Sequence, residues 1–336
     1  MEKNYGSQHE INRRRFLKIA AALTAMAYVP VFGQSAKTDK WGSVLPTRKL
    51  GKTGLDVTIF TLGGGPYNTN MQGEEAIVEA AFKGGCRFFE TAKAYRTEPA
   101  FGKVLEPYRK EIVLSTKSGA FDAETLNRDL DASLKALRTD YLDIYLMHNV
   151  STMESLKRKL DGGVFDAMLK AKEEGKIRHI GFSGHSDYKV NSHLIDKKLP
   201  DLEVMLVPVN VIDPVKDSFI LNTLPTAIDN NIGIMAMKPL GGGAMMGADI
   251  TWGEGKGKKR PRVIPDIIGM KDAQHFVYSM PVSTVSYGCT SVEQVEEDIS
   301  LARNYTLMTK SEQETLIKRV TEIAQNNFLE HYKGTR

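Results

Sequence analysis

The feature that most constrains the fold is a regular alternation of short apolar, strand-like runs with longer helical patterns. The strand-like runs occupy residues 58–62, 86–89, 112–116, 142–147, 177–182, 203–209, 232–236 and 283–286. Helical periodicity between them is clearest over residues 123–137, where leucines recur at helical spacing. Strands that alternate with helices pair in parallel through right-handed crossovers. The sequence therefore predicts an α/β fold, a closed (β/α)8 TIM barrel.

The chain outside this alternation predicts further elements. A glycine turn within KLGKTGLDV predicts an N-terminal β-hairpin, and an extra helix is expected at the C-terminus. Residues 37–45 are interpreted as a linker, and residues 46–336 as a single barrel domain. An open doubly wound sheet is the alternative fold. It would need a GxGxxG fingerprint directly after its first strand, where residues 63–65 offer only GGG.

Four polar residues lie where three of the predicted strands end. Glu90 follows CRFF, Tyr95 lies in the next loop, Lys117 closes IVLST and His148 closes LDIYLM. In a barrel these ends share one rim, so the four side chains are expected to converge. A nearby ammonium would lower the pKa of a tyrosine from its ordinary value of about 10. The set predicts carbonyl reduction, with the tyrosine protonating the developing alkoxide.

The strings around these residues resemble the aldo/keto reductase superfamily. They are KLGKTGLDV, FFETAKAY, STKSG, LDIYLMHN, GKIRHIGFSGHS, MKPLGGG and YGCTSVEQVEEDI. The resemblance implies an NAD(P)(H)-dependent oxidoreductase that moves a hydride between nicotinamide and a small carbonyl or alcohol substrate, such as an aldehyde, ketone or sugar. It assigns Tyr95 as general acid, Lys117 as the group that lowers its pKa and His148 as the group that orients the carbonyl. Glu90, one methylene longer, stands at the family's aspartate position.

The same resemblance implies where a nucleotide cofactor would bind. Its adenosine half is expected on the segment after the last barrel strand, where a helix start offers free N–H groups to a phosphate. The matching positions there are Gly288, Ser291, Gln294, Glu297 and Asp298, the last at a position where the family has asparagine. For the nicotinamide and pyrophosphate, the matching positions are Ser183, Lys238, Pro239, Leu240 and Gly241. The cofactor is expected to be NADP or NAD, with NADP slightly favoured.

Substrate contacts are expected from loops of the same rim. The candidates are Tyr67 in the first loop, His185 after the fifth strand and Trp252 in the seventh loop. A tryptophan in a glycine-rich loop has little core to fill, and its ring could stack on a sugar or aromatic face.

The N-terminus resembles a twin-arginine export signal. Residues 12–18 read NRRRFLK, and an apolar stretch over residues 19–33 follows. Fifteen or so apolar residues are too few to span a bilayer, where about 20 are needed. Residues 1–36 are therefore interpreted as a signal peptide read by the twin-arginine export machinery. The expected product is an exported, periplasmic protein with no stable membrane span after cleavage.

Charge and cysteine usage exclude other classes. The formal net charge is +4, without the clustered basic face that binds nucleic acid. Cys86 and Cys289 have no metal-ligand spacing, so no metal site is expected. Two alternative functions are an exported sugar isomerase or epimerase and a nucleotide-binding barrel with little turnover.

Overall fold

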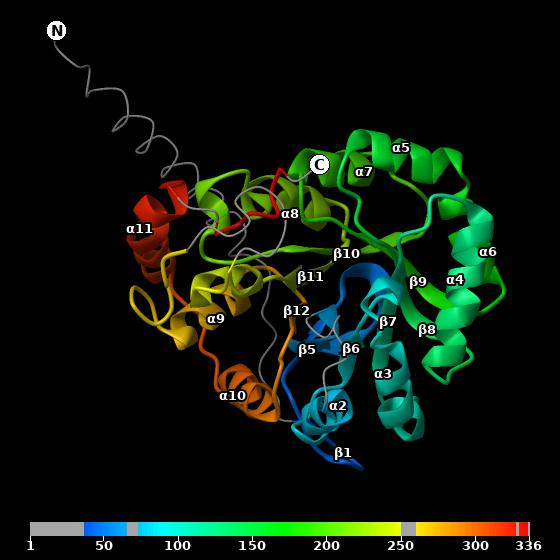
Figure 1. The fold of residues 1–336 in the computed structure, drawn as a ribbon, viewed down its shortest axis with the longest axis horizontal. Helices are drawn as coiled ribbons and strands as arrows, with labels where there is room; N and C mark the ends of the chain where they lie inside the picture. The colour runs from blue at the N-terminus through cyan, green and yellow to red at the C-terminus, as the bar shows by residue number, and fades with distance from the viewer. Residues whose placement is uncertain (1–36, 66–72, 250–259, 327–328, 335–336) are drawn as a thin grey trace, which may run out of the picture.

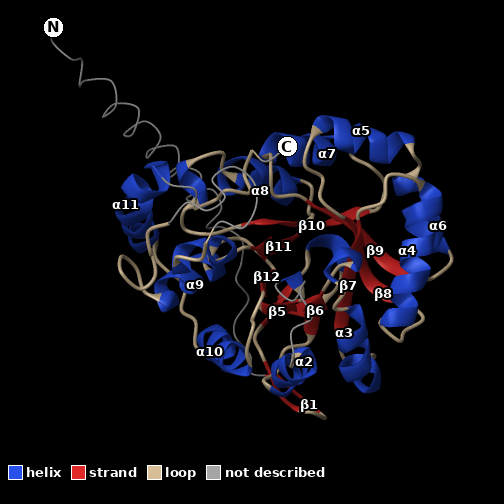
Figure 2. Ribbon diagram, in the orientation of Figure 1, coloured by secondary structure: helices blue, strands red, loops and turns tan. Residues whose placement is uncertain are grey.

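The fold is an eight-stranded parallel barrel surrounded by helices (Figures 1 and 2). It is seen in a computed structural model that describes residues 37–65, 73–249, 260–326 and 329–334. The barrel strands are β5 (Phe60–Gly63), β6 (Phe88–Glu90), β7 (Val113–Ser118), β8 (Leu142–Met147), β9 (Ile177–Ser183), β10 (Leu202–Pro208), β11 (Gly233–Met237) and β12 (Thr284–Tyr287). They follow one another around the barrel in chain order, and β12 closes on β5. The predicted closed barrel is confirmed.

A helix follows each barrel strand, as the alternation predicts. The helices are α2 (Glu74–Lys83), α3 (Glu98–Leu105), α4 (Ala123–Ala136), α5 (Met153–Asp161), α6 (Val164–Glu173), α7 (Tyr188–Asp196), α8 (Phe219–Asp229), α9 (Met270–Tyr278), α10 (Val292–Arg303) and α11 (Lys310–Asn326). The connection between β8 and β9 carries two of them, α5 and α6. The predicted extra C-terminal helix is α11. Asp122 caps the first turn of α4, and Leu126 and Leu130 are buried against the barrel.

The N-terminal hairpin closes one end of the barrel. Strands β3 (Thr47–Lys49) and β4 (Asp56–Thr58) pair antiparallel around a glycine-containing turn, η1 (Gly51–Thr53). Leu50 is fully buried in an apolar cluster with Phe88 and Ile144, which lie on barrel strands. Because Leu50 fills the bottom of the barrel interior, the opening for a site lies at the other end, where the strands finish.

Residues 37–45, interpreted as a linker from the sequence, form a second hairpin instead. Strands β1 (Lys37–Asp39) and β2 (Gly42–Val44) pair antiparallel. Asp39 accepts two hydrogen bonds from the buried Arg87 guanidinium, at 2.7 and 3.1 Å. Trp41 packs edge-on against Tyr108, with ring centroids 4.8 Å apart. Tertiary contacts therefore order a segment that has no strand pattern of its own.

Cys86 and Cys289 are both buried and both free. None of the helices in the described ranges is long and apolar enough to cross a membrane.

Candidate active site

Tyr95 lies in a tight loop between β6 and α3, at the rim where the strands end. The loop includes the short helical turn η3 (Lys93–Tyr95) and then Arg96, whose φ of 63° is left-handed. Thr91 and Thr97 close the neck of the loop with a hydrogen bond of 2.6 Å between their hydroxyls. This hydrogen bond holds the two ends of the loop together and so fixes the position of Tyr95. Tyr95 itself is partly exposed.

Glu90 and Lys117 form a buried ion pair below Tyr95. They come from the neighbouring strands β6 and β7, and their side chains are 5% and 1% exposed. Lys117 Nζ donates to Glu90 Oε1 and, at 2.8 Å, to the backbone oxygen of Thr91. Glu90, although one methylene longer than the family's aspartate, therefore forms the predicted ion pair with Lys117.

The relation between Lys117 and Tyr95 differs from the sequence prediction. Lys117 Nζ lies over the face of the tyrosine ring, 4.5 Å from its centroid. The pKa of Tyr95 is not lowered, because burial disfavours the phenolate and raises this pKa to about 12. Burial and the nearby Lys238 also lower the pKa of Lys117, which weakens the field it exerts. At neutral pH Tyr95 is a protonated phenol, the form that donates a proton.

His148 completes the group at the end of β8. Its ring stands nearly perpendicular to that of Tyr95, with centroids 5.7 Å apart. Burial, together with the charge of Lys117, lowers the pKa of His148 well below its ordinary value. A neutral imidazole beside a neutral phenol can offer two hydrogen-bond donors to one oxygen atom.

The glycines 63–65 make room for this group at the end of β5. A Cβ on Gly64 would lie 2.5 Å from Thr97 Oγ1, and a Cβ on Gly65 would lie 3.5 Å from the ring of Tyr95. The GGG run therefore brings backbone close to the tyrosine loop. The structure thus brings together all four predicted catalytic residues from three strand ends.

Comparison with known proteins identifies the family. The profile of the Aldo/keto reductase family matches residues 59–328. The chain belongs to the aldo/keto reductase family.

Relatives and solved structures agree with this membership. L-galactose dehydrogenase of Arabidopsis thaliana is 27% identical over 289 residues, which are 75% of this chain and 86% of that protein. L-glyceraldehyde 3-phosphate reductase of Escherichia coli K12 is 26% identical over 330 residues, covering 82% of this chain and 92% of that protein. The holo form of an aldo-keto reductase from Bacillus halodurans superposes with a TM-score of 0.67 at 22% identity, covering 82% of this chain and 96% of that one. As a member of this family, the protein is an NAD(P)-dependent oxidoreductase.

The loop after β11 has features that fit a nucleotide in this aldo/keto reductase. Gly241, Gly242 and Gly243 all have left-handed φ values, and Lys238 has a φ of 56°. The ammonium of Lys238 lies 5.1 Å from the ring centroid of Tyr332. No carboxylate within the described residues lies at ion-pair distance from it, and burial lowers its pKa to about 8. A half-buried cation without a carboxylate partner in the described ranges, beside open glycine backbone, suits a pyrophosphate. Pro239 is buried, and Leu240 packs on the core.

In the segment predicted to hold the adenosine half, some residues are exposed and others are engaged in hydrogen bonds within the protein. Gly288 and Glu297 are exposed, and Ser291 caps α10 by accepting from the backbone N–H of Gln294 at 3.3 Å. The Gln294 side chain folds back to accept from the backbone N–H of Thr290 at 2.7 Å.

Asp298, the other adenosine candidate, makes internal contacts. Its carboxylate accepts from Gln274 and, at 3.3 Å, from the Cys289 thiol. Asp298 therefore links α10 to Gln274 on α9 through a hydrogen bond. Burial raises the pKa of its carboxyl group to about 6.

Ser183 and Gly184, at the end of β9 where the nicotinamide is expected, both contact neighbouring segments. Ser183 Oγ accepts from the backbone N–H of Asn149 at 3.2 Å, which leaves its own hydrogen free to donate. A Cβ on Gly184 would lie 2.2 Å from Asn191 Nδ2, so the asparagine of α7 occupies the space that a side chain at 184 would need.

A C-terminal segment that sequence reasoning missed packs onto the same rim. Tyr332 is fully buried, and Asn210 at the end of β10 donates to its hydroxyl at 3.1 Å and to Glu330 at 3.0 Å. Lys333 lies between Asp213 and Glu330, 2.8 and 2.6 Å from their carboxylates. Helical periodicity ends with α11, so no repeating pattern marks this segment in the sequence.

Of the predicted substrate residues, His185 alone lies within the described ranges. Its ring is 5.9 Å from that of Tyr332, and burial lowers its pKa to about 3, which keeps it neutral. Tyr67 and Trp252 lie outside the described residues.

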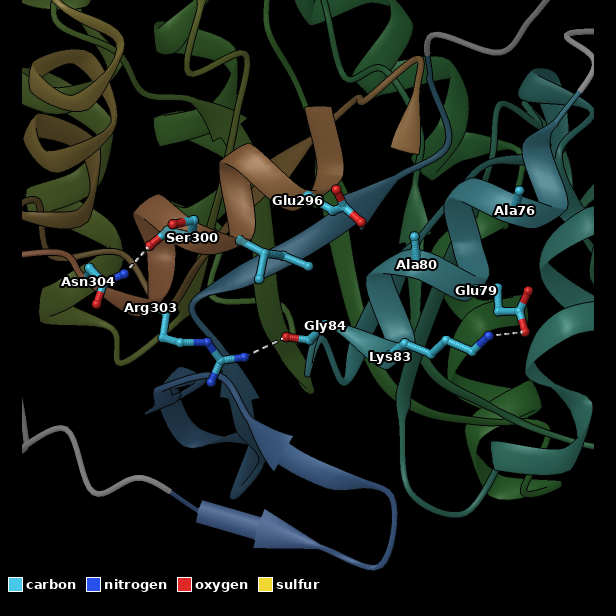
Figure 3. A pocket seen from close by; sticks show the side chains of 10 residues that line it. Ala76, Glu79, Ala80, Lys83, Gly84, Glu296, Ser300, Arg303 and Asn304 are labelled. Atoms are coloured by element: carbon cyan, nitrogen blue, oxygen red, sulfur yellow. Dashed lines mark hydrogen bonds and ion pairs between the residues drawn. The ribbon is translucent and has the colours of Figure 1, made fainter. Parts of the chain in front are cut away.

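A groove on the outer surface is distinct from this site. It lies between α2 and α10 and is lined by residues that include Ala76, Lys83 and Ser300 (Figure 3). Arg303 of α10 reaches across its lower end to the backbone oxygen of Gly84, at 2.7 Å. None of the four catalytic candidates lines this groove.

Proposed function

We propose that this protein reduces the carbonyl group of a small hydroxylated aldehyde or ketone, with Tyr95 as the proton donor. The observation that carries the proposal is the convergence of a neutral phenol and a neutral imidazole above the buried Lys117–Glu90 pair. The nicotinamide nucleotide, when bound, supplies the hydride. Tyr95 would protonate the oxygen as negative charge develops on it, and His148 would hold that oxygen by a second hydrogen bond.

The substrate class is inferred from relatives and from the polarity of the rim. The similar proteins include one named for L-galactose and one named for L-glyceraldehyde 3-phosphate, and both compounds are aldehydes that carry a hydroxyl group beside the carbonyl. Neutral His185 and the phenol of Tyr95 offer hydrogen bonds to hydroxyl groups. An aldose, or the corresponding lactol in the oxidative direction, is therefore the substrate to test first. NADP is the cofactor to test first, and NAD the second.

The test is the Tyr95→Phe variant. We expect it to lose at least about a hundredfold of the rate of NADPH oxidation with an aldose panel, the scale of a lost general acid. Its thermal unfolding and its affinity for the nucleotide should stay unchanged. Equal rates in the variant and the wild type would reject Tyr95 as the acid. Nucleotide binding without turnover in the wild type would support the alternative of a binding barrel.

We also propose that residues 1–36 direct export by the twin-arginine route. The support is the sequence alone, NRRRFLK followed by an apolar stretch. A chain with Arg13→Lys and Arg14→Lys should accumulate in the cytoplasm, whereas the unaltered chain should appear in the periplasmic fraction. Equal distribution of the two chains would contradict a twin-arginine signal.

A further inference from the structure

The two oxygens of Glu90 have different partners on opposite sides. Oε1 pairs with Lys117 on β7, and Oε2 accepts a hydrogen bond of 3.1 Å from Ser286 Oγ on β12. Both Glu90 and Ser286 are buried. Because a buried carboxylate needs both oxygens paired, the hydroxyl of Ser286 completes its coordination.

Ser286 and Glu90 meet across an intervening strand. In the barrel β5 lies between β12 and β6, and its Gly63 is in register with Glu90. A Cβ on Gly63 would lie 2.4 Å from Ser286 Oγ and 3.5 Å from Glu90 Oε2. The absence of a side chain at position 63 therefore opens the path for this hydrogen bond.

The longer glutamate makes this second contact geometrically possible. An aspartate would end about 1.5 Å short, the length of one C–C bond. With the backbone unchanged, the carboxylate of an aspartate could not accept hydrogen bonds from Lys117 and Ser286 at the same time. A glutamate also has one more rotatable bond than aspartate, so it needs a second anchor to hold a single position.

We propose that Ser286 is a positioning residue that fixes Glu90 and, through it, the Lys117 ammonium beneath Tyr95. Glu90, Ser286 and Gly63 thus form one unit that replaces the single aspartate of the family. This inference rests on the proposed function for its rate measurements, but the geometry can be tested without turnover.

A double-mutant cycle tests the coupling in turnover. Ser286→Ala should lower the single-turnover rate of hydride transfer by roughly three- to tenfold, the scale of one buried hydrogen bond. In a Glu90→Asp background the same change should alter the rate less than about twofold, because no bond to Ser286 exists there to lose. Ser115→Ala is the matched control, since Ser115 Oγ is buried on β7 without a partner in the described part of the chain. Equal effects of Ser286→Ala in both backgrounds would overturn the proposal.

A titration of Lys117 gives a readout that needs no substrate. The groups around its ammonium are Glu90, Tyr95, His148 and Lys238. In protein carrying ¹⁵N-labelled lysine, Ser286→Ala should move the Lys117 midpoint downward by about half a pH unit, because Glu90 then holds its charge less well. Ser115→Ala should leave the midpoint in place, and so should Ser286→Ala in the Glu90→Asp background. An unmoved midpoint in the Ser286→Ala single variant would refute the positioning role. If that midpoint shifts in protein that shows no hydride transfer, the positioning role stands and the proposed function fails.

Discussion

Burial sets the protonation state of the individual residues at the rim. Tyr95, Lys117 and His148 are each shifted towards the uncharged form, and the largest cause for each is loss of contact with water. The sequence shows which residue types meet, but not how much water reaches them. That is why the predicted lowering of the Tyr95 pKa was wrong, while the predicted location of Tyr95 at the rim was right. A neutral phenol and a neutral imidazole suit proton donation to an oxygen that becomes negative only as hydride arrives.

Lys238 should make nucleotide affinity depend on pH. Its pKa is lowered to about 8, so its ammonium is charged below pH 8 and loses its charge above it. We expect the dissociation constant of NADP to rise roughly three- to tenfold from pH 7 to pH 9, as one phosphate-facing charge is lost. Titration by intrinsic fluorescence at both pH values measures this. Lys238→Met should bind weakly at both, and a variant as pH-dependent as the wild type would exclude Lys238.

Asp298 should cost stability at neutral pH. Its folded pKa of about 6 lies above its ordinary value of 3.8, so its contribution is greatest below pH 3.8 and is lost as the pH rises through 6. Asp298→Asn keeps a carbonyl for Gln274 and removes the charge. The variant should be more stable than the wild type at pH 7.5, by about 3 kcal/mol at most. At pH 4.5 this gain should shrink to about a third. Urea unfolding at the two pH values checks it, and a constant difference would show that the charge is not responsible.

At the scale of elements, the end of β5 and the tyrosine loop act together. A Cβ at position 64 would lie 2.5 Å from Thr97 Oγ1 and 2.9 Å from Thr91 Oγ1, the pair that closes the loop neck. Gly64→Ala should therefore displace Tyr95, with an overpacking cost of about 1–3 kcal/mol and a rate loss of at least about tenfold. Gly119→Ala is the control, because a Cβ there meets nothing within 4 Å. Thermal unfolding and steady-state rates measure both effects. Matching rates in Gly64→Ala and Gly119→Ala would show that the Thr91–Thr97 contact does not affect catalysis.

The elements themselves were mostly predictable from the sequence. Buried parallel strands are continuous apolar runs, and helices show a 3.6-residue period, so all eight strands and α4 were found within about two residues. The hairpin over residues 37–45 was missed because its order comes from Arg87 and Tyr108, which are distant in sequence. Ser286 was recognised as part of a strand, but its bond to Glu90 crosses β5 and leaves no local pattern. The internal contacts of Asp298 likewise depend on α9 and on Cys289.

At the scale of the whole molecule, the two ends of the barrel have separate tasks. The β3–β4 hairpin fills one end with Leu50, and the other end holds the polar site and the C-terminal segment. Changes at the closed end should therefore act on stability and leave the chemistry alone. The first hairpin, β1–β2, contacts Arg87 and Glu111, which lie just before β6 and β7 at the closed end. It packs on the outside, near α2 (Figure 1).

Two truncations test where the folded domain begins. Removal of residues 1–36, the proposed export signal, should leave stability and activity unchanged, because a signal of this kind is cut from the mature protein. Removal of residues 1–45 would also take away Asp39, the partner of the buried Arg87 guanidinium, and the buried Leu45. Breaking such a pair leaves a buried charge uncompensated, so the shorter chain should lose about 3 kcal/mol or more of unfolding free energy. Urea unfolding of the two chains measures the difference. Equal stability would mean that residues 37–45 are a linker after all, and that Arg87 finds its compensation elsewhere.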